Sequence, residues 1–227
     1  MSWILKYSSK ISIVVLFLCL ESPGNAQTVE QLSVGQAALE VVFPSPPPEP
    51  LRTITLHWIS AAARAVAAYY GRFPVPRLEV RVSIHYGSGV YGGQMADRDK
   101  GLITIGVGQY STAEDLARDW IMAHEMVHLA FPSVFQKHNW MEEGLATYVE
   151  PIARTRTGEL SPEKVWGDMV AGMPQGLPEA GDRGLDFTPT WGRTYWGGAL
   201  FCLLADVEIR KRTGNKLGLE HALRAIM

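Results

Sequence analysis

Two histidines on one predicted helix are the residues best suited to chemistry in this sequence. They are His124 and His128, and Glu125 follows the first of them. Side chains four residues apart share a helix face, so both imidazoles can bind one zinc ion at about 2.0–2.1 Å each. Glu125 lies beside that pair, where a carboxylate can take a proton from a water that the metal activates. The spacing therefore predicts a hydrolytic zinc centre; the alternative is a helix with two solvated or core histidines.

A zinc site of this kind needs a third protein ligand and an open fourth position. Metzincins add a glycine and then a third histidine at fixed spacing after the second. Phe131 and Val134 occupy those positions here, which closes that route. The other solution takes a glutamate from the next helix, and both Glu142 and Glu143 are available there. Ligand chemistry alone does not choose between these two.

Residues 140–150 resemble a known zinc-peptidase pattern. They read Trp-Met-Glu-Glu-Gly-Leu-Ala-Thr-Tyr-Val-Glu, which is similar to the Trp-Leu-x-Glu-Gly-x-x-x-Tyr stretch of two gluzincin families, aminopeptidase N and glycyl aminopeptidase. In that pattern the glutamate directly before the glycine binds zinc, which implies Glu143 here. Glu142 is then left with a solvated place in the first helical turn, where negative charge is favourable. His138, in the preceding loop, is a less favoured ligand that could reach the cleft.

A second stretch, Tyr195 to Leu200, resembles the Tyr-x-Lys-Gly-Ala segment of the same families, with Gly197 in place of the lysine. The resemblance implies that Tyr195 donates a hydrogen bond to the oxyanion that forms during hydrolysis, a role that a neutral phenol can fill. The alternative is a tyrosine that packs on the core at a helix start. Arg193 could face the same cleft or the solvent.

The strand that edges the cleft departs from the family pattern. Those families carry an acidic residue there that helps to hold a substrate's free amino terminus, whereas this chain has Gly92, Gly93 and Gln94 without the acid. The glycines would still let a substrate backbone pair with the strand edge, so these three residues are expected to bind substrate. The resemblance covers roughly residues 85–226 and omits most of the large N-terminal β-domain. It leaves open whether cleavage is terminal or internal.

Hydrophobic periodicity predicts the elements that must position these residues. Residues 51–70 carry apolar side chains at helical spacing, and residues 78–86 alternate as a half-buried strand does. Ser111 and Glu114 form a capping box for a helix that is expected to run through the histidine pair to Pro132. The other expected elements are strands over 38–43 and 102–107, a glycine-rich segment over 87–101, and helices over 140–150, 161–171, 195–212 and 217–227.

Together, these patterns predict an α+β, zincin-like (thermolysin-like) catalytic domain over residues 51–227. A small twisted sheet is expected to pack on the active-site helix, with a helical C-terminal half that completes the cleft. Residues 27–50 are expected to form a strand and a Pro-rich spacer. The implied function is zinc-dependent hydrolysis of peptide bonds in a peptide or protein substrate, with about one Zn²⁺ per chain. The alternative is an exported, zinc-binding but catalytically inactive binding module with a peptidase-like fold.

Charge and the N-terminus indicate the setting in which the protein works. The formal net charge is −2, without the basic footprint of a nucleic-acid binder. Lys6, Lys10 and the apolar run 11–20 predict a signal peptide over residues 1–26, since the run is short for a membrane span. The chain is thus expected to be exported, periplasmic or secreted, with no stable membrane span; an uncleaved N-terminal anchor is the alternative. Cleavage would leave Cys202 as the only cysteine, which excludes an intramolecular disulfide.

Overall fold

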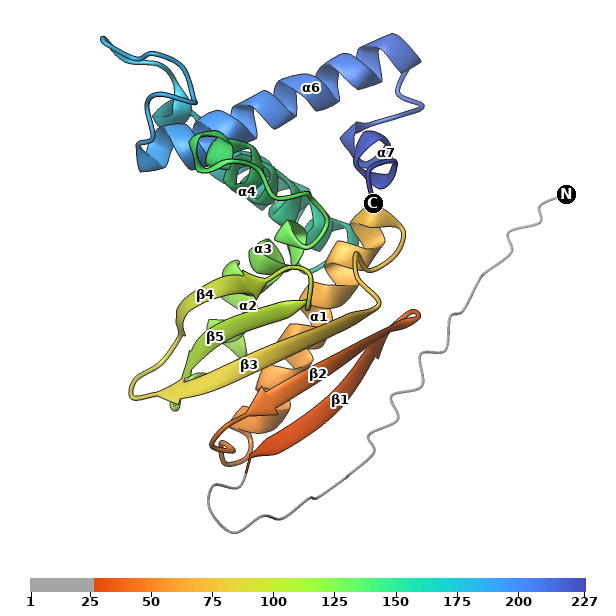
Figure 1. The fold of residues 1–227 in the computed structure, drawn as a ribbon, viewed down its shortest axis with the longest axis vertical. Coiled ribbons are helices and arrows are strands. Elements are labelled where there is room, and N and C mark those ends of the chain that lie inside the picture. The colour runs from red at the N-terminus through yellow and green to blue at the C-terminus, as the bar shows by residue number, and fades with distance from the viewer. Residues whose placement is uncertain (1–26) are drawn as a thin grey trace, which may run out of the picture.

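The computed structural model describes residues 27–227, and the predicted signal peptide over residues 1–26 lies outside them. The strands and main helices, in chain order, are β1 (Thr28–Val34), β2 (Ala37–Phe43), α1 (Leu51–Tyr70), β3 (Arg77–His85), β4 (Val90–Asp97), β5 (Leu102–Gly108), α2 (Ala113–Arg118), α3 (Ile121–His128), α4 (Asn139–Arg156), α5 (Pro162–Gly172), α6 (Gly198–Thr213) and α7 (Leu219–Arg224). The shorter segments are the 3₁₀ turns η1 (Gln136–His138) and η2 (Met173–Gly176) and the π-helical turn η3 (Arg193–Gly197). Figure 1 shows the sheet at one end of the molecule and α6 at the other, with α3 and α4 between them. The expected α+β architecture is confirmed.

The five strands form one mixed sheet in the order β1-β2-β3-β5-β4. The three inner strands run parallel, and each outer strand is antiparallel to its neighbour. β1 was not expected, because Glu30 occupies one of its core-facing positions and breaks the apolar alternation. Glu30 is buried and forms an ion pair with Arg52 of α1, which satisfies its charge inside the protein. The segment before α1 therefore contributes a hairpin to the sheet rather than a single strand.

The helix predicted over residues 51–70 is confirmed with those bounds. Its buried face includes Ile59, Ala63 and Val66, none of which is exposed to solvent. Gly71 ends the helix at φ 80°, a left-handed conformation that glycine adopts without strain. This helix forms the centre of the core, between the sheet and the helices that carry the candidate site.

The single helix predicted from Ser111 to Pro132 is wrong, because the structure has two helices, α2 and α3, in that segment. The capping box is formed by Thr112 and Asp115, whose backbone N–H bonds the Thr112 hydroxyl at 3.1 Å. The chain turns to an extended conformation at Asp119, with ψ 143°. The carboxylate of Asp119 then accepts a hydrogen bond from the backbone N–H of Ile121 at 2.8 Å and starts α3.

A buried arginine of α4 stabilises this break. Arg154 donates hydrogen bonds to the carbonyl oxygens of Ala117 and Asp119 at 2.6 and 2.9 Å, and it pairs with Glu150 at 2.7 Å. No local sequence pattern encodes this long-range contact. The ion pair between Arg154 and Glu150 also stabilises the last turn of α4. This helix continues to Arg156, past its predicted end near Glu150, although Pro151 lies inside it. Arg154 therefore fixes where α3 begins.

Replacement of Arg154 by methionine is expected to cost about 3–5 kcal/mol of unfolding free energy at pH 8, because Glu150 is then buried without a partner. Burial already raises the pKa of the Glu150 carboxyl to about 7, and loss of the guanidinium raises it further. At pH 5 the Glu150 carboxyl is protonated in both folded proteins, but above about 7 the wild type ionises it and the variant does not, so the stability lost by the substitution should be larger at pH 8 than at pH 5. Urea unfolding at both pH values measures it. An equal loss at both pH values contradicts this explanation, and Arg154→Met combined with Glu150→Gln should recover much of the stability.

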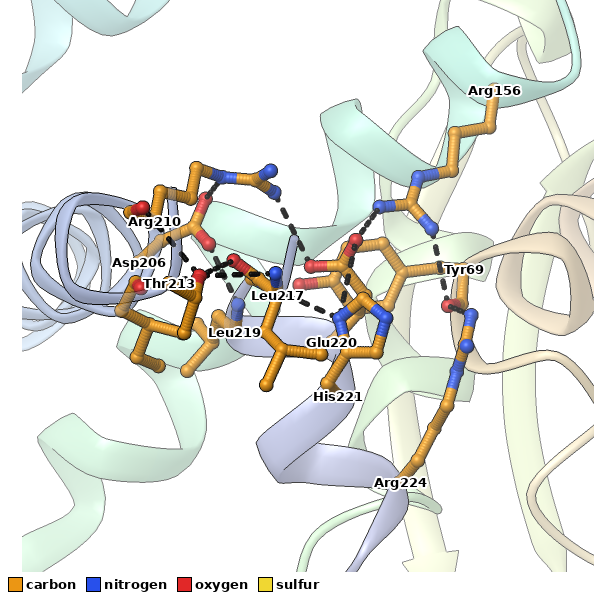
Figure 2. Close-up of polar contacts among 12 residues, drawn as sticks. Tyr69, Arg156, Asp206, Arg210, Thr213, Leu217, Leu219, Glu220, His221 and Arg224 are labelled. Carbon is orange, nitrogen blue, oxygen red and sulfur yellow. Dashed lines mark hydrogen bonds and ion pairs between the residues drawn. The ribbon is translucent and has the colours of Figure 1, made fainter. Parts of the chain in front are cut away.

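The C-terminal helices are joined by a polar cluster, shown in Figure 2. Asp206 of α6 accepts hydrogen bonds from the backbone N–H of Leu219 at 2.6 Å and from Arg210 at 3.0 Å. Glu220 of α7 pairs with Arg156 of α4 at 2.7 Å and with Arg210 at 3.3 Å. Buried charges that are paired in this way hold α7 against α4 and α6. None of the helices in residues 27–227 has both the length and the apolar composition needed to cross a bilayer.

Candidate metal centre

Helices α3 and α4 bring the three predicted metal ligands together. His124 and His128 are both buried on α3, and Glu143 reaches them from the start of α4. The Nε2 atoms of His124 and His128 lie 3.1 and 3.6 Å from the same oxygen, Oε2 of Glu143. One potential ligand atom from each residue lies within 4.8 Å of the others. The three side chains thus converge on one buried point.

This donor set fits a zinc ion. Two ligand atoms of a tetrahedral zinc, each about 2.0–2.1 Å from the metal, are roughly 3.3 Å apart. The separations of 3.1 and 3.6 Å between the imidazole nitrogens and the carboxylate oxygen lie on either side of that value. Two imidazoles and one carboxylate are also a donor set that zinc accepts while keeping a position open.

The protonation states of these groups favour metal binding. Burial lowers the pKa of His124, so its imidazole stays neutral and keeps a lone pair for a metal. Burial acts to raise the pKa of Glu143, but the hydrogen bonds with His124 and His128 outweigh it and hold this pKa well below its ordinary value. A neutral imidazole and an ionised carboxylate are the forms that bind zinc.

Strand β4 fixes the carboxylate of Glu125. The backbone N–H of Met95 donates a hydrogen bond to Oε2 of Glu125 at 2.7 Å. A Cβ on Gly93 would lie 2.4 Å from Ile121 and 3.3 Å from Glu125, so only glycine lets the strand lie this close to α3. Glu125 is near enough to His124 for its charge to act on that imidazole. The structure therefore places this carboxylate beside the histidine pair.

The other two residues predicted to bind substrate flank Gly93 on the same strand. Gly92 has φ 64° at a bulge, a conformation that favours glycine, and Gln94 pairs with Thr104 of β5 and is exposed. The glycine-rich segment expected between two strands is thus itself an edge strand.

Tyr195 is brought to the site by a close helix crossing. A Cβ on Gly144 would lie 2.3 Å from the backbone of Gly198, and a Cβ on Gly198 would lie 2.2 Å from the carbonyl oxygen of Trp140. These contacts put the backbones of α4 and α6 in direct contact just beyond Glu143. Tyr195 lies in the π-helical turn η3 that precedes α6, where the sequence predicted regular helix. Such turns are frequent at functional sites.

The phenol of Tyr195 lies beside the metal ligands. Its ring stacks on His124, with 6.0 Å between ring centroids. Burial, the charge and hydrogen bond of Glu143, and the charge of Glu125 raise the pKa of Tyr195 to about 12. The hydroxyl therefore keeps its proton at neutral pH and remains a hydrogen-bond donor.

Other candidate residues have partners elsewhere. His138 lies 2.8 Å from the carboxylate of Asp186, and Arg193 pairs with Asp182 at 2.6 Å, so both side chains hold the loop before η3. The solvated role expected for Glu142 is wrong, because its side chain is only 14% exposed and is held by protein donors.

Arg98 is a site residue that no sequence pattern indicated. Its guanidinium donates hydrogen bonds to the backbone carbonyl of His128 at 3.0 Å and to Glu142 at 2.7 Å. The second oxygen of Glu142 accepts from the backbone N–H of Val134 at 2.8 Å. One side chain just after β4 thus joins the end of α3 to the start of α4. Its role depends on contacts between distant segments, which local patterns do not show.

Solved structures of zinc metallopeptidases share this fold. One is an aminopeptidase N family protein from Idiomarina loihiensis, with a TM-score of 0.65 and 16% identity, covering 88% of this chain and 40% of that chain. Another is an M1 zinc metallopeptidase from Deinococcus radiodurans, with a TM-score of 0.53 and 16% identity, covering 88% of this chain and 44% of that chain. A mutant M1 metallopeptidase from the same organism, bound to a Tyr-Ser-Ala substrate, has a TM-score of 0.53 and 14% identity, covering 88% of this chain and 44% of that chain.

The comparison confirms the predicted resemblance to the aminopeptidase N family at the level of the fold. The chain spans less than half the length of these proteins, between 40% and 44%. No family model matches the sequence, and no curated protein matches it.

Proposed function

We propose that this chain is a zinc-dependent peptidase of the gluzincin kind, which hydrolyses peptide bonds in an exported setting. One observation carries the proposal: the ligand atoms of His124, His128 and Glu143 converge within 4.8 Å, and Glu125 is fixed beside them by a backbone N–H of β4. The fold shared with M1 zinc metallopeptidases supports it. The predicted signal peptide supports a periplasmic or secreted location.

The chain's own groups supply the remaining chemistry. Zinc, when bound by the three ligands, would polarise the substrate carbonyl and make water a stronger nucleophile. Glu125 accepts the proton of the attacking water and passes it to the leaving nitrogen, while the Met95 N–H keeps the carboxylate in place. Tyr195 donates its hydroxyl proton in a hydrogen bond to the developing oxyanion. Gly92, Gly93 and Gln94 line the path of the substrate backbone.

Metal analysis combined with a mixed peptide library tests the proposal. After gentle purification we expect about one zinc per chain, together with cleavage that a zinc chelator abolishes and added zinc restores. Less than about half a zinc per chain contradicts the metal site. Zinc binding without any cleavage would instead favour an inactive peptide-binding module.

Replacement of Tyr195 by phenylalanine is expected to lower kcat by roughly 10²–10³-fold, the usual effect of removing one oxyanion donor. KM should change little, because the phenol assists the transition state more than the bound substrate. Steady-state kinetics on a peptide from the library measure both constants. If KM rises while kcat stays constant, Tyr195 is a packing or binding residue instead. Tyr110→Phe, at an exposed tyrosine after β5, is the matched control.

A further inference from the structure

The outer edge of β4 faces the candidate metal centre. Among the strands of the described part of the chain, β4 is the last in the sheet and pairs with β5 alone. The backbone N–H of Met95 points to Glu125 of α3, and so away from β5. Side chains and backbone groups alternate along a strand, so Gly93 directs its backbone N–H and C=O to the same edge as Met95. An extended peptide could therefore pair with this edge and pass beside the metal ligands.

The carboxylates around the metal ligands are already committed to partners. On β4, Asp97 accepts a hydrogen bond from the backbone N–H of Lys100 at 3.0 Å and pairs with its ammonium at 3.2 Å. On α4, Glu142 is held by Arg98 and the backbone of Val134. The remaining carboxylates on β4, α3 and the first turn of α4 are those of the proposed general base and of the proposed metal ligand. A peptide's terminal ammonium would thus be desolvated without an acidic partner on these elements, which is costly.

Two large aromatic side chains flank the centre and remain open to solvent. Trp191 stacks on Tyr195 with ring centroids 5.6 Å apart, and 59% of its surface is exposed. Trp120 packs edge-on against His124 at 4.8 Å, with 46% exposed. An exposed aromatic face next to metal ligands is a suitable contact for a large apolar side chain.

Building on the proposed peptidase function, we infer that the site cleaves internal bonds of an extended polypeptide. The substrate backbone pairs with β4, an aromatic or large apolar side chain packs on Trp191 or Trp120, and no free amino terminus is required. Water adds across the bond: the C–N bond breaks, a C–O bond forms, and the leaving nitrogen gains the proton that Glu125 took from water.

Peptides that differ only at their amino terminus test the position of the cleaved bond. Each library substrate is made with a free and with an acetylated amino terminus, and products are identified by mass spectrometry. We expect kcat/KM to change by less than about threefold on acetylation, with cuts inside the chain. A loss of at least about 30-fold, the size expected when a charged anchor is removed, with single residues released from the free peptide, overturns this inference. That outcome leaves the proposed peptidase function intact. If neither form of any peptide is cleaved, both the peptidase function and the internal-cleavage inference are overturned.

Binding to the inactive Glu125→Gln variant tests the aromatic contacts without turnover. In this background, calorimetry is expected to show an aromatic peptide binding about tenfold tighter than the same peptide with alanine at that position. Trp191→Ala or Trp120→Ala should remove most of the difference. Trp166→Ala is the matched control, because Trp166 on α5 is 47% exposed but lines a separate pocket with Val165 and Ile152. Equal affinity for the two peptides in the parent variant overturns the proposed side-chain preference.

Discussion

Replacement of Glu125 by glutamine is expected to abolish peptide cleavage while the zinc content stays near that of the wild type. The amide oxygen of glutamine can still accept the hydrogen bond that Met95 donates at 2.7 Å, so the side chain should keep its place. The amide cannot accept a proton at neutral pH, and general acid–base catalysis is worth about 10²–10⁴-fold. The change therefore removes the chemistry and spares the fold.

Mass-spectrometric rates on the library substrates, zinc analysis and thermal unfolding together measure this effect. Glu114→Gln is the matched control, because Glu114 on α2 is 72% exposed and, within residues 27–227, forms an ion pair with Arg118 alone. If Glu125→Gln keeps more than about a tenth of the wild-type kcat/KM, Glu125 is not the general base. Equal, background-level cleavage by wild type and variant would mean that the domain binds peptides without hydrolysing them.

Local sequence patterns correctly predicted the helices and strands whose buried face follows the spacing of their apolar residues. Residues 51–70 form a helix with the expected bounds, and the alternation in residues 78–86 corresponds to β3. The prediction failed where a distant charged side chain decides the local structure. Arg154 stabilises the break between α2 and α3, and Arg52 allows Glu30 of β1 to face the protein core. Ion pairs of this kind leave no periodic trace in the sequence.

The candidate site likewise combines features that local sequence predicts with features that depend on distant contacts. The spacing of His124 and His128 is a local property of one helix, so the sequence could place both imidazoles on one face. The preference for Glu143 came from a family resemblance, since either glutamate could serve chemically. The structure adds a physical reason, because Arg98 and the backbone N–H of Val134 already occupy the two oxygens of Glu142. The glycine contact between α4 and α6, which brings Tyr195 to the ligands, depends on how the helices cross.

Glutamine substitutions at the two adjacent glutamates are expected to impair different properties: zinc binding for Glu143→Gln and folding stability for Glu142→Gln. Glu143→Gln removes the only anionic ligand and should weaken zinc binding by more than about 100-fold, beyond the loss typical of outer-shell changes. Glu142→Gln should keep zinc affinity within about tenfold. It should instead lower the free energy of unfolding by roughly 1–3 kcal/mol, because Arg98 loses a partly buried ionic partner. Competition with a chromogenic chelator measures affinity, and urea unfolding measures stability.

The change in melting temperature on zinc removal separates these roles even if one variant folds poorly. A ligand that binds only the folded state raises stability in proportion to the logarithm of its concentration over Kd. Chelation should therefore lower the melting temperature of wild type and of Glu142→Gln by similar amounts, and that of Glu143→Gln hardly at all. The opposite pattern would make Glu142 the ligand and require Arg98 to release it. Because each variant is compared with itself, a general loss of stability cannot imitate either result.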